Sequence, residues 1–175
     1  MSGNFVGETL ELVMGQEFLT WLWFKSEDSG VFKDADGNDF SVIMEKRIVV
    51  QGGEGDLIET ASVSGAMSEL REARLGLRTG KKVTRALVRF DQEPESWQFT
   101  LKAEDFSLGS FKTPKVESSP EKDDNPEAIF FEKIYLIEKG LSFLDVIYKT
   151  FIELRMSAAW KDEVELIQRW LYPDN

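Results

Sequence analysis

Hydrophobic positions along the chain fall into blocks whose spacing predicts helices near both ends and strands between them. From residue 18 to residue 24 only Thr20 is polar, so no solvent-facing side exists and a buried helix is expected over 16–24. The middle of the chain is rich in β-branched and aromatic residues, and apolar and polar residues alternate in parts of it, as in half-buried strands. The predicted strands are 40–50, 57–63, 82–90 and 96–102, with a weaker one at 107–113.

Two polar, glycine-containing segments predict turns between these strands. Residues 34–39 read DADGND and lie between apolar residues, which is a hairpin signal. The same segment superficially resembles a calcium loop, but Gly37 stands fourth where an EF-hand needs glycine sixth. We therefore expect a turn and no metal site. Residues 51–56, QGGEGD, predict a second turn and lack the spacing of a phosphate loop.

Three further helices are predicted from apolar stripes. The first begins after Ser64 as N-cap and ends at Gly80, with Met67, Leu70, Ala73 and Leu77 on one side. A long helix is indicated by apolar residues at alternating spacings of four and three, namely Phe130, Ile134, Ile137, Leu141, Leu144, Tyr148 and Phe151. The alternative is that the aromatic and β-branched residues 130–137 form a strand and the helix begins later, but we favour the helix. The last helix follows Ser157 as N-cap, with Trp160, Val164, Ile167 and Leu171 on one side.

The order of these elements predicts an α+β fold with an antiparallel or mixed central sheet. An apolar helix precedes the sheet, a central helix interrupts it, and a long helix plus a capping helix follow it. The length of 175 residues suits a single domain, 1–175. Three prolines within 114–127 predict a flexible loop before the C-terminal helices.

Composition narrows the function classes. The chain has no cysteine and no histidine, which excludes thiolate nucleophiles, Ser-His-Asp triads and sites with Cys or His ligands. No other catalytic constellation stands out, so we expect no enzyme, no cofactor and no metal. The N-terminus lacks signal-peptide features, and no apolar run is long enough for a bilayer. We therefore expect a cytoplasmic protein without a membrane partner.

Charge is distributed unevenly. The formal net charge is −11, yet residues 71–89 hold seven basic residues and one acidic residue. If a helix and the next strand present these cations on adjoining surfaces, the cations can bind the phosphate backbone of a nucleic acid. The equally weighted alternative is a solvated basic surface that pairs with the protein's own carboxylates. The predicted DNA-binding residues are Arg71, Arg74, Arg78, Lys81, Lys82, Arg85 and Arg89.

Two segments are similar to a known family. Residues 15–26, GQEFLTWLWFKS, and 79–92, TGKKVTRALVRFDQ, resemble parts of the second half of the RdgC-type recombination-associated proteins. The matching positions are Leu19-Thr20-Trp21 in the first segment and Gly80, Lys81, Val83 and Thr84 in the second. The resemblance covers about 16–155 and implies a bacterial, non-enzymatic protein that binds double-stranded DNA with little sequence preference, modulates recombination and forms a homodimer. The chain lacks a counterpart of the family's first half.

A function of another class is also consistent with the sequence. An acidic protein-interaction or scaffold domain, imitating DNA by its negative charge, would not bind DNA itself. Its partner would contact an aromatic helix, through Phe18, Trp21 and Trp23 or through Trp160 and Trp170. Against this reading, most of these tryptophans lie on apolar helical sides, where packing in a core is the ordinary role.

Overall fold

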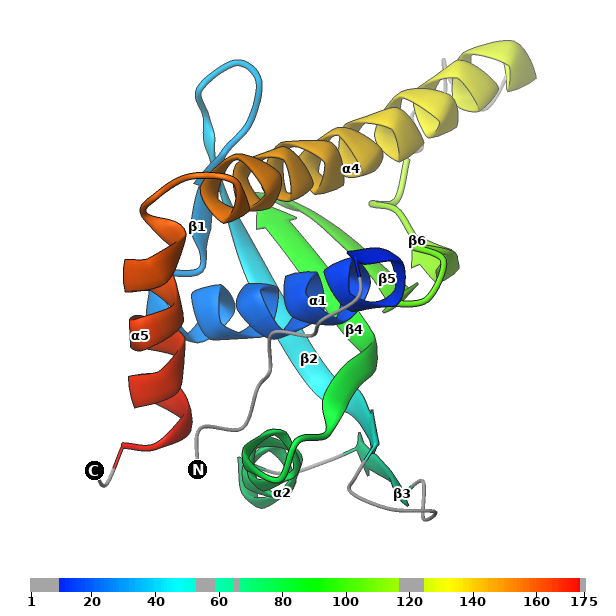
Figure 1. Cartoon of the computed structure of the whole chain (residues 1–175). Helices are drawn as coiled ribbons and strands as arrows, with labels where there is room; N and C mark the ends of the chain where they lie inside the picture. Colours follow the sequence, from blue (N-terminus) through cyan, green and yellow to red (C-terminus); the bar gives the residue numbers. More distant parts are fainter. Residues whose placement is uncertain (1–9, 53–58, 65–66, 117–124, 174–175) are drawn as a thin grey trace.

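The computed structural model describes residues 10–52, 59–64, 67–116 and 125–173 (Figure 1). Helices stand near both ends of the described chain and strands occupy its middle, as the sequence predicts. The elements are α1 (Leu10–Asp28), β1 (Val31–Lys33), β2 (Asp39–Gly52), β3 (Glu59–Ser64), α2 (Met67–Arg78), β4 (Lys82–Gln92), β5 (Glu95–Lys102), β6 (Leu108–Lys112), α4 (Pro126–Arg155) and α5 (Trp160–Leu171).

The strands form one six-stranded antiparallel sheet in the order β1-β2-β4-β5-β6, with β3 also paired to β2. The predicted α+β class is therefore confirmed. Strand β2 is long enough to pair with β1 at its start and β3 at its end, while β4 lies along its other side. Register shifts after Met44 and Val49 interrupt the β2–β4 ladder, as bulges do.

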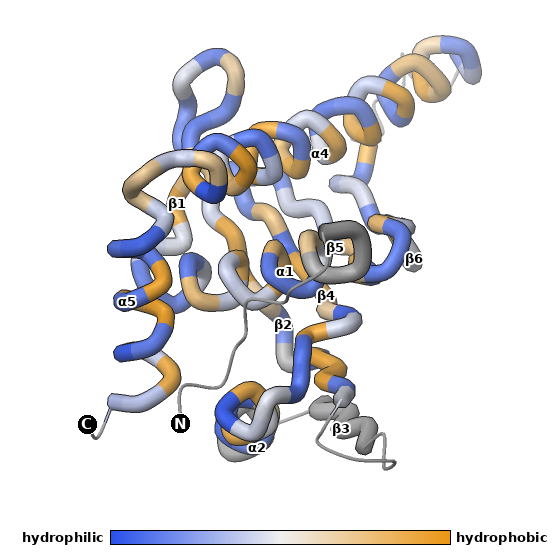
Figure 2. The backbone as a smooth tube through the Cα atoms, viewed as in Figure 1, coloured by the Kyte–Doolittle hydropathy of each residue, from blue (hydrophilic) through white to orange (hydrophobic). Residues whose placement is uncertain are grey.

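Alternate strand positions supply the core. Ala86, Val88 and Phe90 on β4 are fully buried, and they pair with Leu101, Phe99 and Trp97 on β5, which are buried as well. The helices pack on this side of the sheet: α1 crosses the central strands, and α4 places Phe143 within ring contact of Phe40, Phe90 and Trp97 (Figures 1 and 2). We call this side the core face and the opposite side the outer face.

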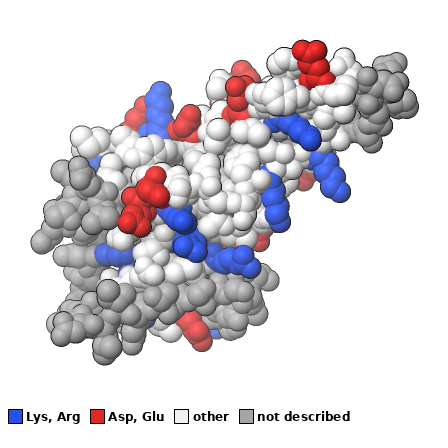
Figure 3. Space-filling view, turned by 90° about the vertical axis from the view of Figure 1, so that its right-hand side faces the viewer, with Lys and Arg blue, Asp and Glu red and all other residues white. Residues whose placement is uncertain are grey.

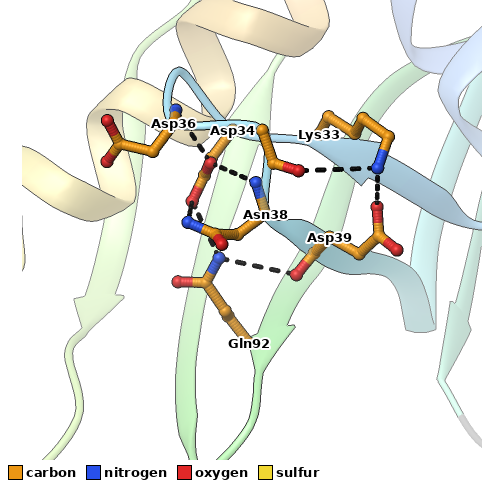
Figure 4. Close-up of polar contacts among 7 residues, drawn as sticks. Lys33, Asp34, Asp36, Asn38, Asp39 and Gln92 are labelled. Carbon is orange, nitrogen blue, oxygen red and sulfur yellow. Dashed lines mark hydrogen bonds and ion pairs between the residues drawn. The ribbon is translucent and has the colours of Figure 1, made fainter.

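The predicted hairpin at 34–39 is confirmed as the connection between β1 and β2 (Figure 4). The Asp34 carboxylate accepts from the backbone N–H of Asp36 at 3.0 Å and of Asn38 at 2.8 Å. Gln92 on β4 donates to the same carboxylate at 2.9 Å. These hydrogen bonds lower the pKa of Asp34, the Gln92 bond most. Asp34 thus stabilises a turn, and the described residues contain no cluster of acidic side chains suited to a metal.

The termini of two helices differ from the prediction. Ser64 is the last residue of β3 rather than an N-cap, because its backbone pairs with Arg47. Ser157 precedes the last helix without capping it: its hydroxyl donates to the Leu154 carbonyl, and Ala159 holds the N-cap position. The predicted stop at Gly80 is confirmed, since this residue has a φ of 87° just after α2.

The long helix α4 includes residues 130–137, so the strand alternative for this segment is wrong. Asn125 caps its N-terminus by accepting from the Ala128 N–H at 3.3 Å. The residues that α4 buries are nevertheless not the predicted stripe. They are Leu136, Gly140, Phe143, Ile147 and Phe151, of which only Phe151 was expected.

Some sequence predictions fall outside the described residues. They are most of the turn at 51–56, the start of the strand at 57–63, the first residues of the helix after Ser64, and the centre of the proline-containing loop 114–127. Among the described helices, none combines the length and apolar character needed to cross a bilayer.

Candidate nucleic-acid interface

The two strand arginines of the predicted cluster lie on the outer face. On β4, Arg85 is exposed and Arg89 is half-buried, whereas their neighbours Ala86 and Val88 face the core. This alternation is the one predicted from the sequence. The same alternation would place Thr84 on the core side, but Thr84 is half-buried, and its hydroxyl donates to the Val49 carbonyl at 3.3 Å beside the irregular β2–β4 pairing.

Arg85 has basic neighbours that the cluster at 71–89 did not include. Lys102 on β5 is its direct cross-strand partner, and Val49 is its partner on β2. Arg47 stands two residues before Val49, within the register shift of the β2–β4 ladder, and its exposed side chain is on the outer face because the next residue, Ile48, is fully buried. Directly opposite side chains such as those of Arg85 and Lys102 are about 5 Å apart at Cβ. We call Arg47, Arg85 and Lys102 the outer basic row.

All three side chains of the outer basic row are exposed. Among the described residues, no carboxylate forms a salt bridge with any of them. The pKa of Asp105 is lowered mainly by its hydrogen bonds with Ser107, and the charge of Lys102 lowers it further. The row is therefore a set of solvated cations drawn from three adjacent strands.

A shallow hollow lies beside Arg85 and Lys102. Its volume is about 360 Å³, and it is open to solvent. Its lining is mostly polar and includes one carboxylate, that of Glu104; the complete set is Gln16, Gln51, Thr84, Arg85, Lys102, Ala103 and Glu104. Two cations, two amides and a hydroxyl around an open hollow can hold an anionic oxygen group by ion pairing and hydrogen bonding.

Arg89 is held by acidic neighbours on the same face. Its guanidinium donates to Glu45 at 2.6 Å and to Asp91 at 3.1 Å. Both carboxylates are less exposed than the arginine itself. An arginine with two carboxylates has little net positive charge to offer a phosphate.

The helix arginines of the predicted cluster do not continue the outer basic row. Arg74 forms a salt bridge with Glu27 on α1 and lies over the Trp170 ring of α5, at 4.6 Å from the centroid. The Nε of Arg78 donates to the Leu171 carbonyl, and its guanidinium lies 5.4 Å from the ring centroid of Tyr172. Both contacts are with the helical layer, so these two arginines join α2 to the rest of the protein.

Of the remaining three predicted residues, one lies within α2 and two lie at the junction between α2 and β4. Arg71 is exposed, and Lys81 and Lys82 are half-buried at the junction. Burial lowers the pKa of Lys82, while the negative charge of Glu17 opposes this shift. Glu17 is itself buried and accepts from Arg155 at 3.0 Å.

The single continuous track expected from seven cations is therefore not formed. Arg74 and Arg78 point into the helical layer and Arg89 is neutralised by its neighbours, as the alternative reading of the cluster anticipated. On the molecular face shown in Figure 3, basic and acidic side chains are interspersed over a largely uncharged surface. Arg85 is the member of the predicted set that combines full exposure with a basic cross-strand neighbour.

The aromatic residues considered as a partner surface are core residues. Phe18, Trp21, Trp23 and Trp160 are buried, and Trp170 is half-buried between α1, α2 and α5. Trp21 also donates to the buried Glu163 at 2.9 Å, which fixes α5 against α1. A partner cannot reach the four buried side chains without displacing the helices.

Comparison with known proteins gives no relative to guide the assignment: family models, curated proteins and solved structures all fail to match this chain.

Proposed function

We propose that this chain binds double-stranded DNA without sequence preference, through the outer basic row Arg47, Arg85 and Lys102. The observation that carries the proposal is the direct cross-strand pairing of Arg85 with Lys102 on a solvent-facing part of the sheet. Flexible cations spaced by the strand separation contact successive phosphates without reading base edges.

The resemblance to RdgC-type recombination-associated proteins supports the same function. The segment 79–92, which carries part of that resemblance, contains the whole of β4 with Arg85, and the cation at a position that matches the family is Lys81. The resemblance implies a non-enzymatic protein that modulates recombination. We propose that this chain has the same role and performs it by occupying DNA. Of the seven residues predicted from the sequence, this proposal keeps Arg85 at its centre, with Arg71, Lys81 and Lys82 as peripheral contacts.

The phosphate contacts make the proposed binding sensitive to salt, and the overall charge of −11 weakens it by repelling DNA. Phosphate contacts release condensed counterions, and each contributes nearly one unit to the slope of log K against log salt concentration. A three-cation contact on an acidic protein should therefore be measurable at low salt and weak at physiological salt.

A titration of a labelled duplex of about 20 base pairs, followed by fluorescence anisotropy between about 50 and 200 mM salt, tests the proposal. The triple variant Arg47→Ala, Arg85→Ala, Lys102→Ala should flatten the salt slope by nearly three units. A matched variant, Lys115→Ala, Lys133→Ala, Lys161→Ala, removes the same charge from exposed positions elsewhere and should keep the slope of the unmodified protein. Equal losses in both variants, or no salt-dependent binding, would refute the proposal.

A further inference from the structure

The N-terminal half of α4 carries large apolar side chains that no described residue covers. Phe130, Phe131 and Tyr135 are each about 60% exposed, and Ile137 and Leu141 are about 40% exposed. In Figure 1 this half of the helix projects beyond the sheet, and Figure 2 shows hydrophobic residues along it. Apolar side chains concentrated on one projecting element mark an interaction surface rather than ordinary surface variation.

Four of the residues on this half form a straight stripe. Phe130, Ile134, Ile137 and Leu141 recur at spacings of four, three and four, which places them on one side of a helix with 3.6 residues per turn. This is the first part of the stripe that the sequence predicts as core. We call these four residues the α4 stripe.

In the second half of α4 the same side of the helix is occupied by the protein itself. Tyr148 continues the stripe and contacts the rings of Phe18 at 5.3 Å and Phe106 at 5.1 Å. Leu144 likewise packs against the core. The α4 stripe, in which Ile134 is half-buried and the other three residues are exposed, is therefore the open end of a seam whose other end packs against the core, and it covers about three turns of helix.

Charges beside the α4 stripe restrict what can cover it. Glu127, Glu138 and Asp145 are all exposed, and they follow one another along one side of the stripe at spacings of eleven and seven residues. Further round the helix on the same side, other exposed residues include Phe131, Tyr135 and Lys149. On the other side, the exposed charge is that of Lys133. An apolar seam edged by carboxylates is complementary to a helix with an apolar stripe edged by Lys or Arg.

A second copy of this chain fits the surface poorly. If two copies paired antiparallel along the α4 stripe, their carboxylate edges would face each other, which is repulsive. If they paired parallel, their C-terminal halves would also come together, where Leu144 and Tyr148 are already covered by the same chain. Neither arrangement matches the charge and shape of this surface.

We propose that the α4 stripe is the docking surface for an amphipathic, basic helix of another protein. The partner's apolar residues, spaced by three and four, would pack onto Phe130, Ile134, Ile137 and Leu141, and its cations would pair with Glu138 and Asp145. This proposal is independent of DNA binding, because α4 and the outer basic row share no residues.

Two designed helical peptides test the proposal with the full chain. Both carry Leu at the stripe spacing and Ala elsewhere, but one has Lys and the other Glu at the flanking positions. Fluorescence anisotropy should show that the Lys peptide binds at least tenfold more tightly than the Glu peptide. The double variant Phe130→Ser, Ile137→Ser should reduce binding of the Lys peptide at least tenfold. Glu138→Lys should narrow the preference between the peptides.

Met156→Ser is the matched control, because Met156 is an exposed apolar residue outside the α4 stripe. It should bind the Lys peptide as the unmodified protein does. All substituted side chains are exposed, so circular dichroism should show the same melting temperature in every variant. Equal binding of both peptides, or undiminished binding by the double variant, would overturn the proposal. So would a dimer in sedimentation experiments that the double variant dissociates, because the occupant would then be a second copy.

Discussion

The guanidinium of Arg74 on α2 lies over the indole of Trp170 on α5, 4.6 Å from the ring centroid. The two side chains share an acceptor, since Glu27 on α1 forms a salt bridge with Arg74 and accepts from the Trp170 indole N–H at 2.8 Å. Three helices are thereby joined at one point. An arginine that the sequence assigns to DNA binding is, in the folded protein, a contact between helices.

Replacing Arg74 by alanine should destabilise the protein without weakening DNA binding. The loss combines a partly buried ion pair with stacking on Trp170, for which about 1–3 kcal/mol is expected. Urea denaturation measures this change. Arg85→Ala provides the contrast: it should leave the free energy of unfolding within about 0.5 kcal/mol and weaken duplex binding. If Arg74→Ala weakened duplex binding and Arg85→Ala destabilised the protein instead, the roles assigned to both arginines would be contradicted.

Replacing Glu163 by alanine should be among the most damaging single changes in α5. Glu163 is 7% exposed, and its Oε1 accepts from Trp21 at 2.9 Å and lies 2.5 Å from the Lys25 ammonium. Removing the carboxylate leaves a buried donor without its acceptor, so a loss of about 2–4 kcal/mol is expected in urea denaturation. Glu165→Ala, an exposed change on the same helix, should cost less than about 0.5 kcal/mol. Similar costs for the two variants would show that the Trp21 contact is unimportant.

A methyl group at position 140 should disturb the packing of α4 against the sheet. A Cβ on Gly140 would stand 2.6 Å from Trp97 Cδ1 and 3.0 Å from Phe111 Cζ. Alanine also improves helix propensity by up to about 1 kcal/mol, but overpacking costs about 1–3 kcal/mol and should dominate. Displacing Trp97 would also weaken the 2.8 Å hydrogen bond from its Nε1 to the Leu136 carbonyl. We expect a lower thermal midpoint for Gly140→Ala and an unchanged one for the exposed Ser142→Ala; an increase for Gly140→Ala would refute the packing argument.

The turn between β1 and β2 should depend on pH through Asp34. Its pKa lies below the ordinary value of 3.8, mainly because Gln92 donates to the carboxylate. A lowered pKa in the folded state means that Asp34 stabilises the fold above pH 3.8, and that this contribution is lost as pH falls through the lower folded pKa.

Gln92→Met should raise the pKa of Asp34 toward its ordinary value, as followed by carboxyl-carbon NMR. Asp105 is an internal control, because its pKa is lowered by Ser107 in a different loop and should not change. An unchanged Asp34 titration would show that Gln92 does not stabilise the ionised form.

The regular features of the fold follow from local patterns. Alternation over 82–90 and 96–102 fixes which side chains face the core, and the glycine at position 80 fixes the end of α2, because both depend on backbone geometry alone. The wrong prediction of which α4 residues are buried has a different cause. That helix has two apolar sides, and only the tertiary arrangement decides that the side containing Leu136 and Phe143 packs on the sheet while the α4 stripe stays exposed.

The candidate site was partly predictable for a similar reason. Alternation identifies Arg85 as a surface residue and also places Lys102 on the polar side of its strand. The pairing of the two depends on the β4–β5 register. The involvement of Arg47 depends on the irregular pairing between β2 and β4. The structural role of Arg74 could not be predicted from the sequence. Glu27 and Trp170 are distant from it along the chain and contact it only after the helices pack.

The most direct test of the account is to map amide chemical shifts while duplex DNA is added at low salt. DNA bound through the outer basic row should most strongly shift the amides of Arg47, Arg85, Thr100 and Lys102, which lie on three adjacent strands, and leave those of Arg74 and Arg78 on α2 unchanged. Shifts centred on Arg74 and Arg78, or none at saturating duplex, would contradict it.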